Sequence, residues 1–362
     1  MVKKILKVII LVFILVIIFS FYMANRMDVF KTLTAQTPDV CSVLPMNGSA
    51  EDIKIDYERG LAYLSLEDRA ALIKGEDVQG TVVQINLNKS PYELKPALSQ
   101  QPDHLRPHGI SLYIDNNGQR HLGVINHPKN RDLGTETVEL FSEGISGLFN
   151  YQKTVKDNTF KSPNALVLVA QDKFYLGNDK GAETMFGKIQ EQLGRPMSSI
   201  AYFNGNSVVI AAKNLSQVSG INVSNNQEYL FASETTAKRI AVFSIDAENG
   251  ELNKLETIKI SGSPDNINIT DKGDIIVAAI PKVIALIQHF ISFQKEEVIP
   301  APSQILRLKW EFGSHGSKTR IDELFLSTGD DFSTASVGTI WKNRLFMGSI
   351  DDKKLLICDE LT

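Results

Sequence analysis

Cysteine, tryptophan and histidine are scarce in this chain of 362 residues, which contains 2 cysteines, 2 tryptophans and 6 histidines. Neither cysteine belongs to a C-x-x-C pair, so the sequence predicts no zinc ribbon and no dithiol redox site. The chain also lacks an excess of positive charge, since its formal net charge is -4. We therefore expect no nucleic-acid partner. A G-x-S-x-G elbow, a Walker loop, an H-E-x-x-H pair and a dinucleotide fingerprint are all missing, which argues against the enzyme classes that depend on them.

Charge is absent altogether from residues 8–24, an apolar run that follows Lys3, Lys4 and Lys7. The run is longer than the core of a signal peptide and is not followed by an A-x-A-like cleavage site. It approaches the roughly 20 residues that span a bilayer, and the preceding lysines favour an inside amino terminus. We expect residues 1–27 to be a membrane anchor, with a cleaved signal segment and a secreted protein as the alternative. In both cases residues 28–362 lie outside the cytoplasm, in a periplasmic, lumenal or extracellular space.

The two cysteines, Cys41 and Cys358, stand near opposite ends of the remaining chain. A disulfide between them suits an oxidising compartment. It would close a loop of more than 300 residues, and the chain-entropy model assigns about 4 to 5 kcal/mol to such long closures. Two buried free thiols are the alternative.

Between the cysteines, a short motif of one or two polar residues followed by two apolar-alternating strands recurs six times. Its polar heads are Glu51-Asp52, His108-Gly109, Asn164-Ala165, Ser219-Gly220, Asp265-Asn266 and Ser336-Val337. Their spacing of about 46 to 70 residues is typical of propeller blades. Residues 221–245 show the strand meander most plainly, with turns at 225–226 and 235–236. The sequence therefore predicts an all-β fold, a six-bladed β-propeller preceded by one N-terminal helix, with the cysteines at the ring closure.

Helical periodicity is weak in the rest of the chain. Residues 281–293 are the exception, since their apolar positions suit a short amphipathic helix. We expect this helix to cover one face of the propeller, with a solvent-side decoration as the alternative. Four histidines outside the motif heads have no partner at metal-ligand spacing, and we expect them on the surface or in loops. They are His104, His121, His289 and His315.

The motif heads predict a metal site, because the first strand of each propeller blade lines the central channel and equivalent positions converge there. Most of the heads carry oxygen donors, namely carboxylates, amides and hydroxyls. Calcium takes six to eight oxygen ligands, whereas zinc and copper prefer cysteine and histidine. Taken singly, each head residue is better explained as a strand-start cap or a turn residue than as a metal ligand. Taken together, in register with the repeat, they indicate a calcium site.

The ordered motifs resemble the paraoxonase/arylesterase family of calcium-dependent six-bladed propellers. The shared segments are Ser49-Ala50-Glu51-Asp52, Pro107-His108-Gly109-Ile110-Ser111, Asn126-His127-Pro128, Asn178-Asp179, Gly220-Ile221-Asn222 and Asp265-Asn266-Ile267. The resemblance covers the chain from Cys41 to Cys358 and implies the same disulfide between the two ends. It also implies that Glu51, Asn164, Ser219, Asp265 and Asn266 surround a catalytic calcium ion.

The resemblance further assigns proton transfer to His108 and His127. A calcium ion would polarise an ester or lactone carbonyl while one histidine deprotonates water and the other relays the proton. The alternative for His127 is an extended residue before Pro128 that packs in a second strand. The alternative for His108 is a channel residue without a catalytic role.

Several positions depart from the family pattern. Ser219 replaces an asparagine ligand, which predicts weaker binding of the catalytic calcium. Ala165 replaces an aspartate that would hold a second, structural calcium with Asp52 and the carbonyl of Ile110, so this second ion is less well supported. Differences in the pocket prevent the substrate range from being carried over. They are Lys180 for a histidine, Gln217 for an aromatic residue and Ile280 for a histidine.

We therefore expect a calcium-dependent hydrolase of lactones or aryl esters, acting on a small molecule outside the cytoplasm. One alternative is a catalytically weak, membrane-anchored binding or chaperone scaffold, which Ser219 and Ala165 favour. Another alternative keeps the metal and changes the substrate to sugar lactones or phosphotriesters. The sequence does not indicate the oligomeric state.

Overall fold

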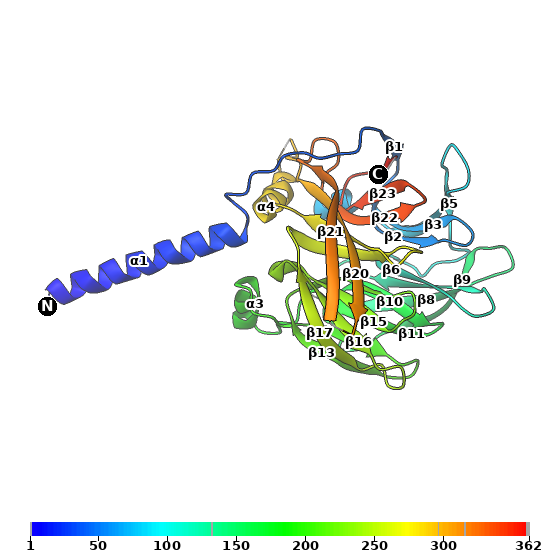
Figure 1. The fold of residues 1–362 in the computed structure, drawn as a ribbon, viewed down its shortest axis with the longest axis horizontal. Helices are drawn as coiled ribbons and strands as arrows, with labels where there is room; N and C mark the ends of the chain where they lie inside the picture. The colour runs from blue at the N-terminus through cyan, green and yellow to red at the C-terminus, as the bar shows by residue number, and fades with distance from the viewer. Residues whose placement is uncertain (1, 132, 296, 315, 360–362) are drawn as a thin grey trace.

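The computed structural model describes residues 2–131, 133–295, 297–314 and 316–359, which form one long helix and a ring of β-sheets. Helix α1 (Val2–Arg26) projects away from the ring (Figure 1), and its apolar side chains are exposed along most of its length. In the described part of the chain it is the one helix long and apolar enough to cross a membrane. The predicted N-terminal helix is therefore present, and its length and composition suit an anchor or a signal segment equally.

Six four-stranded antiparallel sheets make up the described ring, as the sequence repeat predicts. Blade 1 contains β2 (Ser49–Asp56), β3 (Leu61–Glu67), β4 (Thr81–Asn86) and β5 (Leu94–Pro96). Blade 2 contains β6 (Pro107–Ile114), β7 (Arg120–Asn126), β8 (Thr137–Glu143) and β9 (Phe149–Val155). Blade 3 contains β10 (Pro163–Ala170), β11 (Lys173–Asn178), β12 (Ser198–Phe203) and β13 (Val208–Leu215).

The other three blades follow the same meander, with one exception at the ring closure. Blade 4 contains β14 (Val218–Val223), β15 (Tyr229–Glu234), β16 (Arg239–Ile245) and β17 (Leu252–Lys259). Blade 5 contains β18 (Ser263–Ile269), β19 (Ile275–Ile280), β20 (Ser303–Gly313) and β21 (Gly316–Ser327). Blade 6 contains β22 (Ala335–Trp341), β23 (Arg344–Ser349), β24 (Lys354–Cys358) and, from the other end of the chain, β1 (Cys41–Pro45).

The hydrophobic core is divided among the blade interfaces. Each of the six buried clusters found among the described residues combines side chains of two neighbouring blades, and together the clusters run once around the ring. The first strands of the blades, β2, β6, β10, β14, β18 and β22, contact one another around the channel. Packing between blades therefore fixes the height of each inner strand relative to its neighbours, and with it the position of the polar motif heads.

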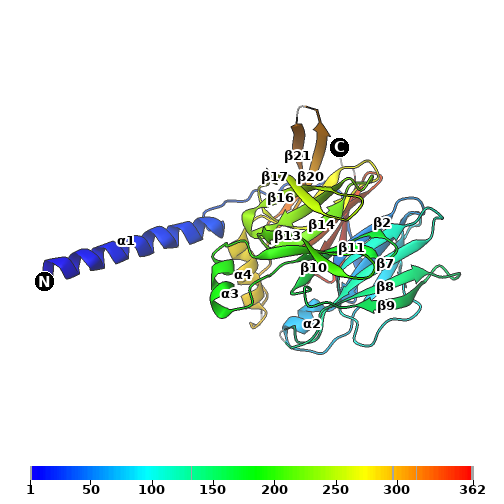
Figure 2. The ribbon, with the colours of Figure 1, turned by 90° about the horizontal axis from the view of Figure 1, so that it is seen from below.

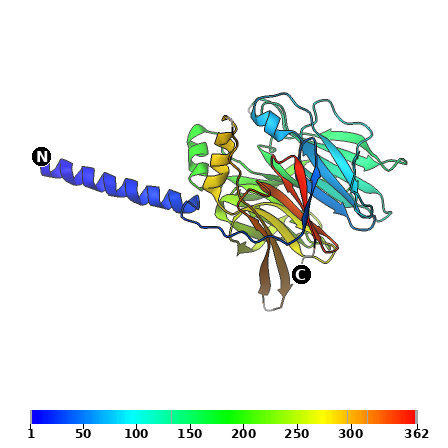
Figure 3. The ribbon, with the colours of Figure 1, turned by 90° about the horizontal axis from the view of Figure 1, so that it is seen from above.

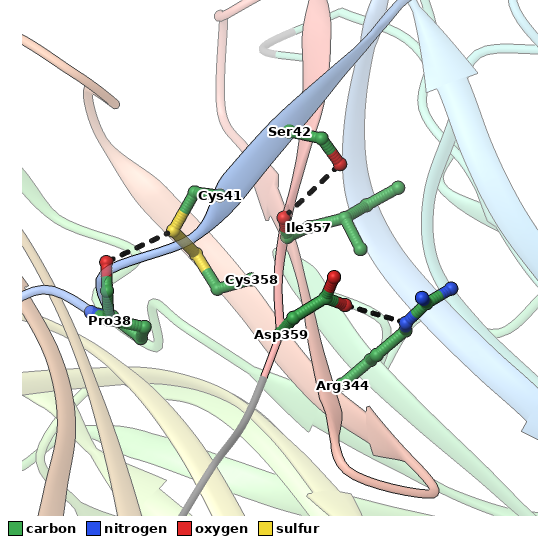
Figure 4. Close-up of a disulfide and its surroundings, with 7 residues drawn as sticks. All are labelled: Pro38, Cys41, Ser42, Arg344, Ile357, Cys358 and Asp359. Atoms are coloured by element: carbon green, nitrogen blue, oxygen red, sulfur yellow. Dashed lines mark hydrogen bonds and ion pairs between the residues drawn. A yellow bond between two sulfur atoms is a disulfide. The ribbon is translucent and has the colours of Figure 1, made fainter.

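The ring is closed by the pairing of β1 with β24, in which Cys41 lies opposite Cys358. The two sulfur atoms are bonded at 2.02 Å, so the predicted disulfide is present (Figure 4). Close to it, Ser42 Oγ donates a hydrogen bond to the carbonyl of Ile357, and Arg344 pairs with Asp359 at 2.6 Å. A strand from each end of the propeller is thus held by the sheet and by a covalent bond.

In the described chain, three short α-helices lie outside the sheets of the ring: α2 (Arg69–Ile73), α3 (Met185–Gln192) and α4 (Val283–Ser292). Helix α4 is the amphipathic helix expected at 281–293, and a 3-10 turn, η1 (Thr235–Ala237), occupies one of the expected hairpin turns. Helices α3 and α4 lie on the side of the propeller that faces α1 (Figures 2 and 3). The amide of Ile284 donates to the carbonyl of Met27, so α4 contacts the segment that leaves the N-terminal helix.

Two histidines expected at the surface are buried, and that expectation was wrong for both. His121 is 0% exposed because its ring lies between Ser142 Oγ at 2.9 Å and Asp115 Oδ2 at 3.4 Å. His289 is 1% exposed because α4 packs against blade 6 and brings its Nε2 within 3.0 Å of Asp351 Oδ2. His104 is exposed in a loop, as expected, and His315 lies outside the described residues.

Candidate functional site

Each inner strand has an irregular register close to its first residues. The breaks lie between Ala50 and Ile53, Pro107 and Ile110, Pro163 and Ala165, Val218 and Ile221, Pro264 and Ile267, and Ala335 and Val337. In every blade the break contains polar motif-head residues that the sequence repeat brings into register. A β-bulge turns the side chains of its extra residues away from the regular alternation. The six bulges thus form a ring of polar residues at one end of the channel.

Two glycines let neighbouring bulges approach closely. A Cβ atom on Gly109 would lie 2.4 Å from the carbonyl oxygen of Asn164 in the next blade. Likewise, a Cβ atom on Gly220 in blade 4 would lie 2.2 Å from the carbonyl oxygen of Asp265 in blade 5. Since real Cβ atoms do not come so close to backbone atoms, only glycine fits at the two positions where one bulge packs against the backbone of the bulge in the next blade. The Gly-Ile pairs in the sequence motifs therefore belong to the assembly of the ring.

Glu51 joins three blades at the centre of this ring. Its Oε1 accepts a hydrogen bond of 2.9 Å from Asn266 Nδ2, and its backbone carbonyl accepts from the same amide and from Ser336 Oγ. Its other carboxylate oxygen, Oε2, is buried without a hydrogen-bond partner among the described residues. An unpaired oxygen on a residue that is only 2% exposed is costly, and such an oxygen is suited to binding a cation.

Negative charge accumulates around Asp265. Burial and the nearby carboxylates of Glu51, Asp52 and Asp179 raise its pKa well above the usual aspartate value. Burial also raises the pKa of Glu51, although the Arg69 guanidinium opposes this. The Asp265 side chain makes no hydrogen bond or ion pair to any residue that the structure describes. These carboxylates would favour a bound cation, which would offset both their burial and their mutual repulsion.

The predicted ligands Glu51, Asn164, Ser219, Asp265 and Asn266 are named the outer cluster below. Asn164 Oδ1 is another buried oxygen without a direct hydrogen bond in the described chain, although the Asn164 side chain is close enough to His108 to act against the lowering of that ring's pKa. Ser219 Oγ lies 2.8 Å from Thr235 Oγ1. No group of three or more histidine, cysteine or acidic side chains suited to a metal occurs among the described residues. The outer cluster has two carboxylates and completes its set with amide and hydroxyl oxygens. This donor set fits a hard cation such as calcium.

His108 and His127 are adjacent to one another, with ring centroids 4.7 Å apart. His108 Nε2 lies 3.6 Å from Glu51 Oε1, which places this histidine beside the outer cluster. Burial, followed by the positive charge of neighbouring groups, lowers the pKa of both histidines well below its ordinary value. The Nε2 atom of each ring is buried without a hydrogen-bond partner in the described chain. Two neutral imidazoles, each with an unpaired nitrogen, are suited to accepting and passing a proton.

Glu136 orients His127, and sequence reasoning missed it. His127 Nδ1 lies 2.6 Å from Glu136 Oε2, while Arg131 Nε pairs with the other carboxylate oxygen at 2.8 Å. With its Nδ1 proton donated to the carboxylate, His127 keeps Nε2 as its basic nitrogen. A second missed residue, Arg69, donates to the carbonyls of Ser49 and Pro107, the first residues of β2 and β6. It thereby holds the strands that carry Glu51 and His108.

A cavity of about 510 Å³ opens beside His127. Its walls include His104, Arg106 and Asn126 but none of the outer cluster. His127 therefore contacts open space on one side and His108 on the other. Asp179, the remaining missed residue, follows Asn178 in one of the sequence motifs, and its Oδ1 is buried without a partner in the part of the chain that the structure describes.

The surroundings of Asp52 and Ile110 differ from those of the outer cluster. Asp52 Oδ2 accepts a hydrogen bond of 2.9 Å from the backbone amide of Ile110, and Oδ1 accepts from Ile53 N and Lys54 Nζ. The lysine also donates to Asn268 Oδ1 at 3.0 Å. Asp52, Lys54 and Asn268 are named the inner cluster below. Three of the roughly four acceptor positions of the Asp52 carboxylate are already used, one of them by a lysine ammonium, so this environment fits a second calcium ion poorly.

Comparison with known proteins relates the whole chain to one family. A sequence profile described as Arylesterase matches residues 24–360. Serum paraoxonase/lactonase 3 of Mus musculus is 27% identical over 346 residues, covering 92% of this chain and 93% of that protein. Serum paraoxonase/arylesterase 2 of Bos taurus is 25% identical over 326 residues, covering 88% of each chain.

Solved structures support the fold at lower identity. A luciferin-regenerating enzyme superposes with a TM-score of 0.53 at 12% identity, covering 89% of this chain and 95% of the other. A periplasmic gluconolactonase from Pseudomonas aeruginosa gives a TM-score of 0.51 at 10% identity, with 87% and 85% covered. At such identities the similarity establishes the propeller architecture alone.

Proposed function

Because the chain belongs to the arylesterase family of carboxylic ester hydrolases, we propose that it hydrolyses lactones or aryl esters in a calcium-dependent reaction at the outer cluster. The observation that carries this proposal is the concentration of unpaired oxygens there. Glu51 Oε2 and Asn164 Oδ1 are buried without partners in the described chain, beside an Asp265 carboxylate whose pKa is strongly raised. The substrate classes follow from the names of relatives, a lactonase and an arylesterase.

The outer cluster would hold one calcium ion. Glu51 and Asp265 supply negative charge, and Asn164, Asn266 and Ser219 supply neutral oxygens. When bound, calcium supplies Lewis-acid polarisation of the substrate carbonyl and stabilises the negative oxygen of the tetrahedral intermediate. Asn266 uses its amide hydrogens on Glu51, which leaves its own Oδ1 available as a ligand.

The histidine pair would move the proton. A water molecule loses a proton to an imidazole nitrogen as its oxygen bonds to the carbonyl carbon. When the intermediate collapses, the bond from that carbon to the leaving oxygen breaks, and the proton passes to the leaving alkoxide or phenoxide. His108 is the nearer of the two to the outer cluster, and His127 relays the proton while Glu136 fixes its ring. The lowered pKa values keep both rings neutral and ready to accept the proton near neutral pH.

We propose that this reaction takes place outside the cytoplasm, and the N-terminal helix supports this location. Lys3, Lys4 and Lys7 precede the apolar segment and favour an inside amino terminus, which orients the propeller to the opposite side of the membrane. The disulfide between Cys41 and Cys358 suits the oxidising conditions expected there. We therefore propose a membrane-anchored hydrolase whose propeller is periplasmic, lumenal or extracellular.

The test is hydrolysis of γ-lactones, δ-lactones and phenyl acetate by the full chain in detergent micelles, with calcium and with EDTA. We expect activity that requires calcium and falls about 10²- to 10⁴-fold in His108→Gln, the range for removing a general base. Lys95→Gln is the control, because Lys95 pairs with Glu93 on the surface and the two side chains are 62% and 68% exposed. Equal activity in EDTA, or equal loss in both variants, would contradict the proposal.

A second candidate function is a non-catalytic binding scaffold. It is favoured by Ser219, a short ligand whose hydroxyl already lies 2.8 Å from that of Thr235. If this reading holds, the protein binds calcium without hydrolysing any ester on the panel. In the hydrolase reading, Ser219→Asn strengthens calcium binding, because the longer amide reaches further into the outer cluster.

A further inference from the structure

Lys54 carries a positive charge into the channel. Its side chain is 11% exposed and its ammonium lies 2.8 Å from Asp52 Oδ1, whose side chain is 3% exposed. The same ammonium donates to Asn268 Oδ1 at 3.0 Å, across the channel from blade 1 to blade 5. A lysine at this depth requires compensation, and it has a carboxylate and an amide oxygen as partners.

The network around Lys54 connects four blades. Asp52 lies on β2 and accepts from the amide of Ile110 on β6, which links blades 1 and 2. Asn268 lies on β18 and donates from Nδ2 to the carbonyl of Gly338 on β22, which links blades 5 and 6. The lysine joins these two halves. Both oxygens of Asp52 and both ends of the Asn268 amide are thereby used.

This arrangement opposes the binding of a metal ion to Asp52. The N–H of Ile110 donates to Asp52 Oδ2 at 2.9 Å, so this oxygen already has a partner where a metal ion would bind. Ala165, which is 3% exposed, offers no oxygen where a second carboxylate would be needed. A divalent cation placed on Asp52 would also face the ammonium of Lys54 at close range in a buried site, where electrostatic repulsion is strong.

We propose that the Lys54 ammonium takes the place of a second, structural calcium ion, so that the protein binds one calcium ion and its inner strands are cross-linked without metal. The count of one rests on the proposed function, which assigns the single ion to the outer cluster. The consequence is a separation of roles: chelation removes the ion needed for hydrolysis, while the inner cluster keeps the propeller folded.

The first experiment is the calcium content of the full chain in detergent, measured by elemental analysis after equilibration with excess calcium and removal of free ion. We expect one calcium ion per chain, and two would overturn the proposal. A content of zero ions would contradict the proposed function but not the role of Lys54. In that case the unfolding of Lys54→Met, described next, would decide whether the Lys54 proposal holds.

The second experiment is thermal unfolding in EDTA of Lys54→Met, which keeps the length of the side chain and removes the charge. We expect its Tm to fall by about 5 to 10 °C, because Asp52 is left buried without its cation. Lys95→Met is the matched control, since Lys95 pairs with Glu93 on the surface and the two side chains are 62% and 68% exposed. A fall in Lys54→Met no larger than in the control would overturn the proposal.

A gain of metal binding provides the converse test. In the double variant Lys54→Met with Ala165→Asp, the ammonium is removed and the aspartate that the family resemblance pairs with Asp52 is restored. We expect this protein to bind one more calcium ion than the wild type and to recover Tm when calcium is added. A variant that folds but binds no additional ion at millimolar calcium would contradict the claim that Lys54 and a second calcium compete for this place. If Lys54→Met does not fold, the calcium content of the wild type still decides.

Discussion

The inner cluster lies on β2 and β18, two of the four strands that carry the outer cluster, yet the two clusters differ in how completely their polar groups are paired. In the inner cluster every charge has a partner: Lys54 contacts Asp52 and Asn268, and Asp52 accepts three hydrogen bonds. In the outer cluster Glu51 keeps an unpaired oxygen and the Asp265 carboxylate has no hydrogen bond among the described residues. Of these two clusters, the outer cluster is the one with carboxylate oxygens that lack hydrogen bonds within the described chain. These oxygens are available to a ligand and a substrate.

Removing a charge from the outer cluster gives the largest effect and the sharpest form of this comparison. In Asp265→Asn we expect hydrolysis to fall by at least ~10³-fold, because the proposed calcium site would lose one of its two carboxylates. Without calcium the same variant should be more stable than the wild type by about 0.5 to 2 kcal/mol, since repulsion between carboxylates is relieved. With calcium the order reverses.

The sign of that effect follows from the raised pKa of Asp265. Because folding raises the pKa of this carboxylic acid, its ionisation destabilises the folded state relative to the unfolded state. In the absence of calcium, this destabilisation is present near neutral pH. Thermal unfolding in EDTA measures the expected gain in stability of Asp265→Asn, and thermal unfolding in calcium measures the expected loss. Asp103→Asn, at an exposed position, is the control. A variant that is less stable than the wild type in EDTA would break the comparison.

Glu136→Gln tests whether the histidine pair depends on an oriented His127. The amide keeps the size of the side chain but loses the carboxylate that accepts from His127 Nδ1 and pairs with Arg131. We expect kcat to fall by about 10- to 100-fold, as for other groups that orient a catalytic imidazole, with KM changed by less than about twofold. Steady-state kinetics measure this against Glu183→Gln, which alters an exposed ion pair with Lys161. A rise in KM at constant kcat would point to substrate binding instead.

His289 extends the comparison to a buried charge outside the channel. Burial alone would lower its pKa, but the Asp351 carboxylate and the Ile299 carbonyl outweigh it and raise the pKa. The stabilisation by the charged ring is therefore full below the unfolded pKa of about 6.5 and is lost as pH rises through the folded pKa. We expect His289→Gln to lose about 1 to 2 kcal/mol at pH 5.5 and less at pH 9.

Unfolding by denaturant at both pH values measures this difference, with His104→Gln as the surface control. A loss that is the same at pH 5.5 and pH 9 would show that the hydrogen bonds of His289 matter and its charge does not. Because His289 anchors α4 to blade 6 through Asp351, the same experiment reports how firmly this helix is held.

Much of the architecture was accessible from sequence because the repeat is local. Strand alternation and the polar heads predicted six blades, and the positions of Cys41 and Cys358 predicted the ring closure that the structure confirms. The repeat also brought the outer-cluster residues to one level, although it did not reveal that each head is part of a bulge. Their role as calcium ligands stays a prediction.

The features that sequence reasoning missed depend on contacts between distant segments. The alternation of polar and apolar residues in β2 predicts that Lys54 points away from the apolar side of the strand. It does not identify the partner Asn268, which is 214 residues away in sequence. Glu136 reaches His127 through a loop whose course no periodicity specifies. His289 looked like a surface residue because the amphipathic pattern of α4 does not identify the acidic partner on blade 6.

The central claim is that calcium serves the outer cluster while the inner cluster holds the fold without metal. The most direct measurement is a calcium titration of the EDTA-treated wild type, with lactone hydrolysis and thermal unfolding followed in the same samples. The account predicts a folded protein without activity at zero calcium, and activity that rises to saturation with one ion per chain. Full activity without calcium, or a propeller that unfolds when calcium is removed, would contradict it.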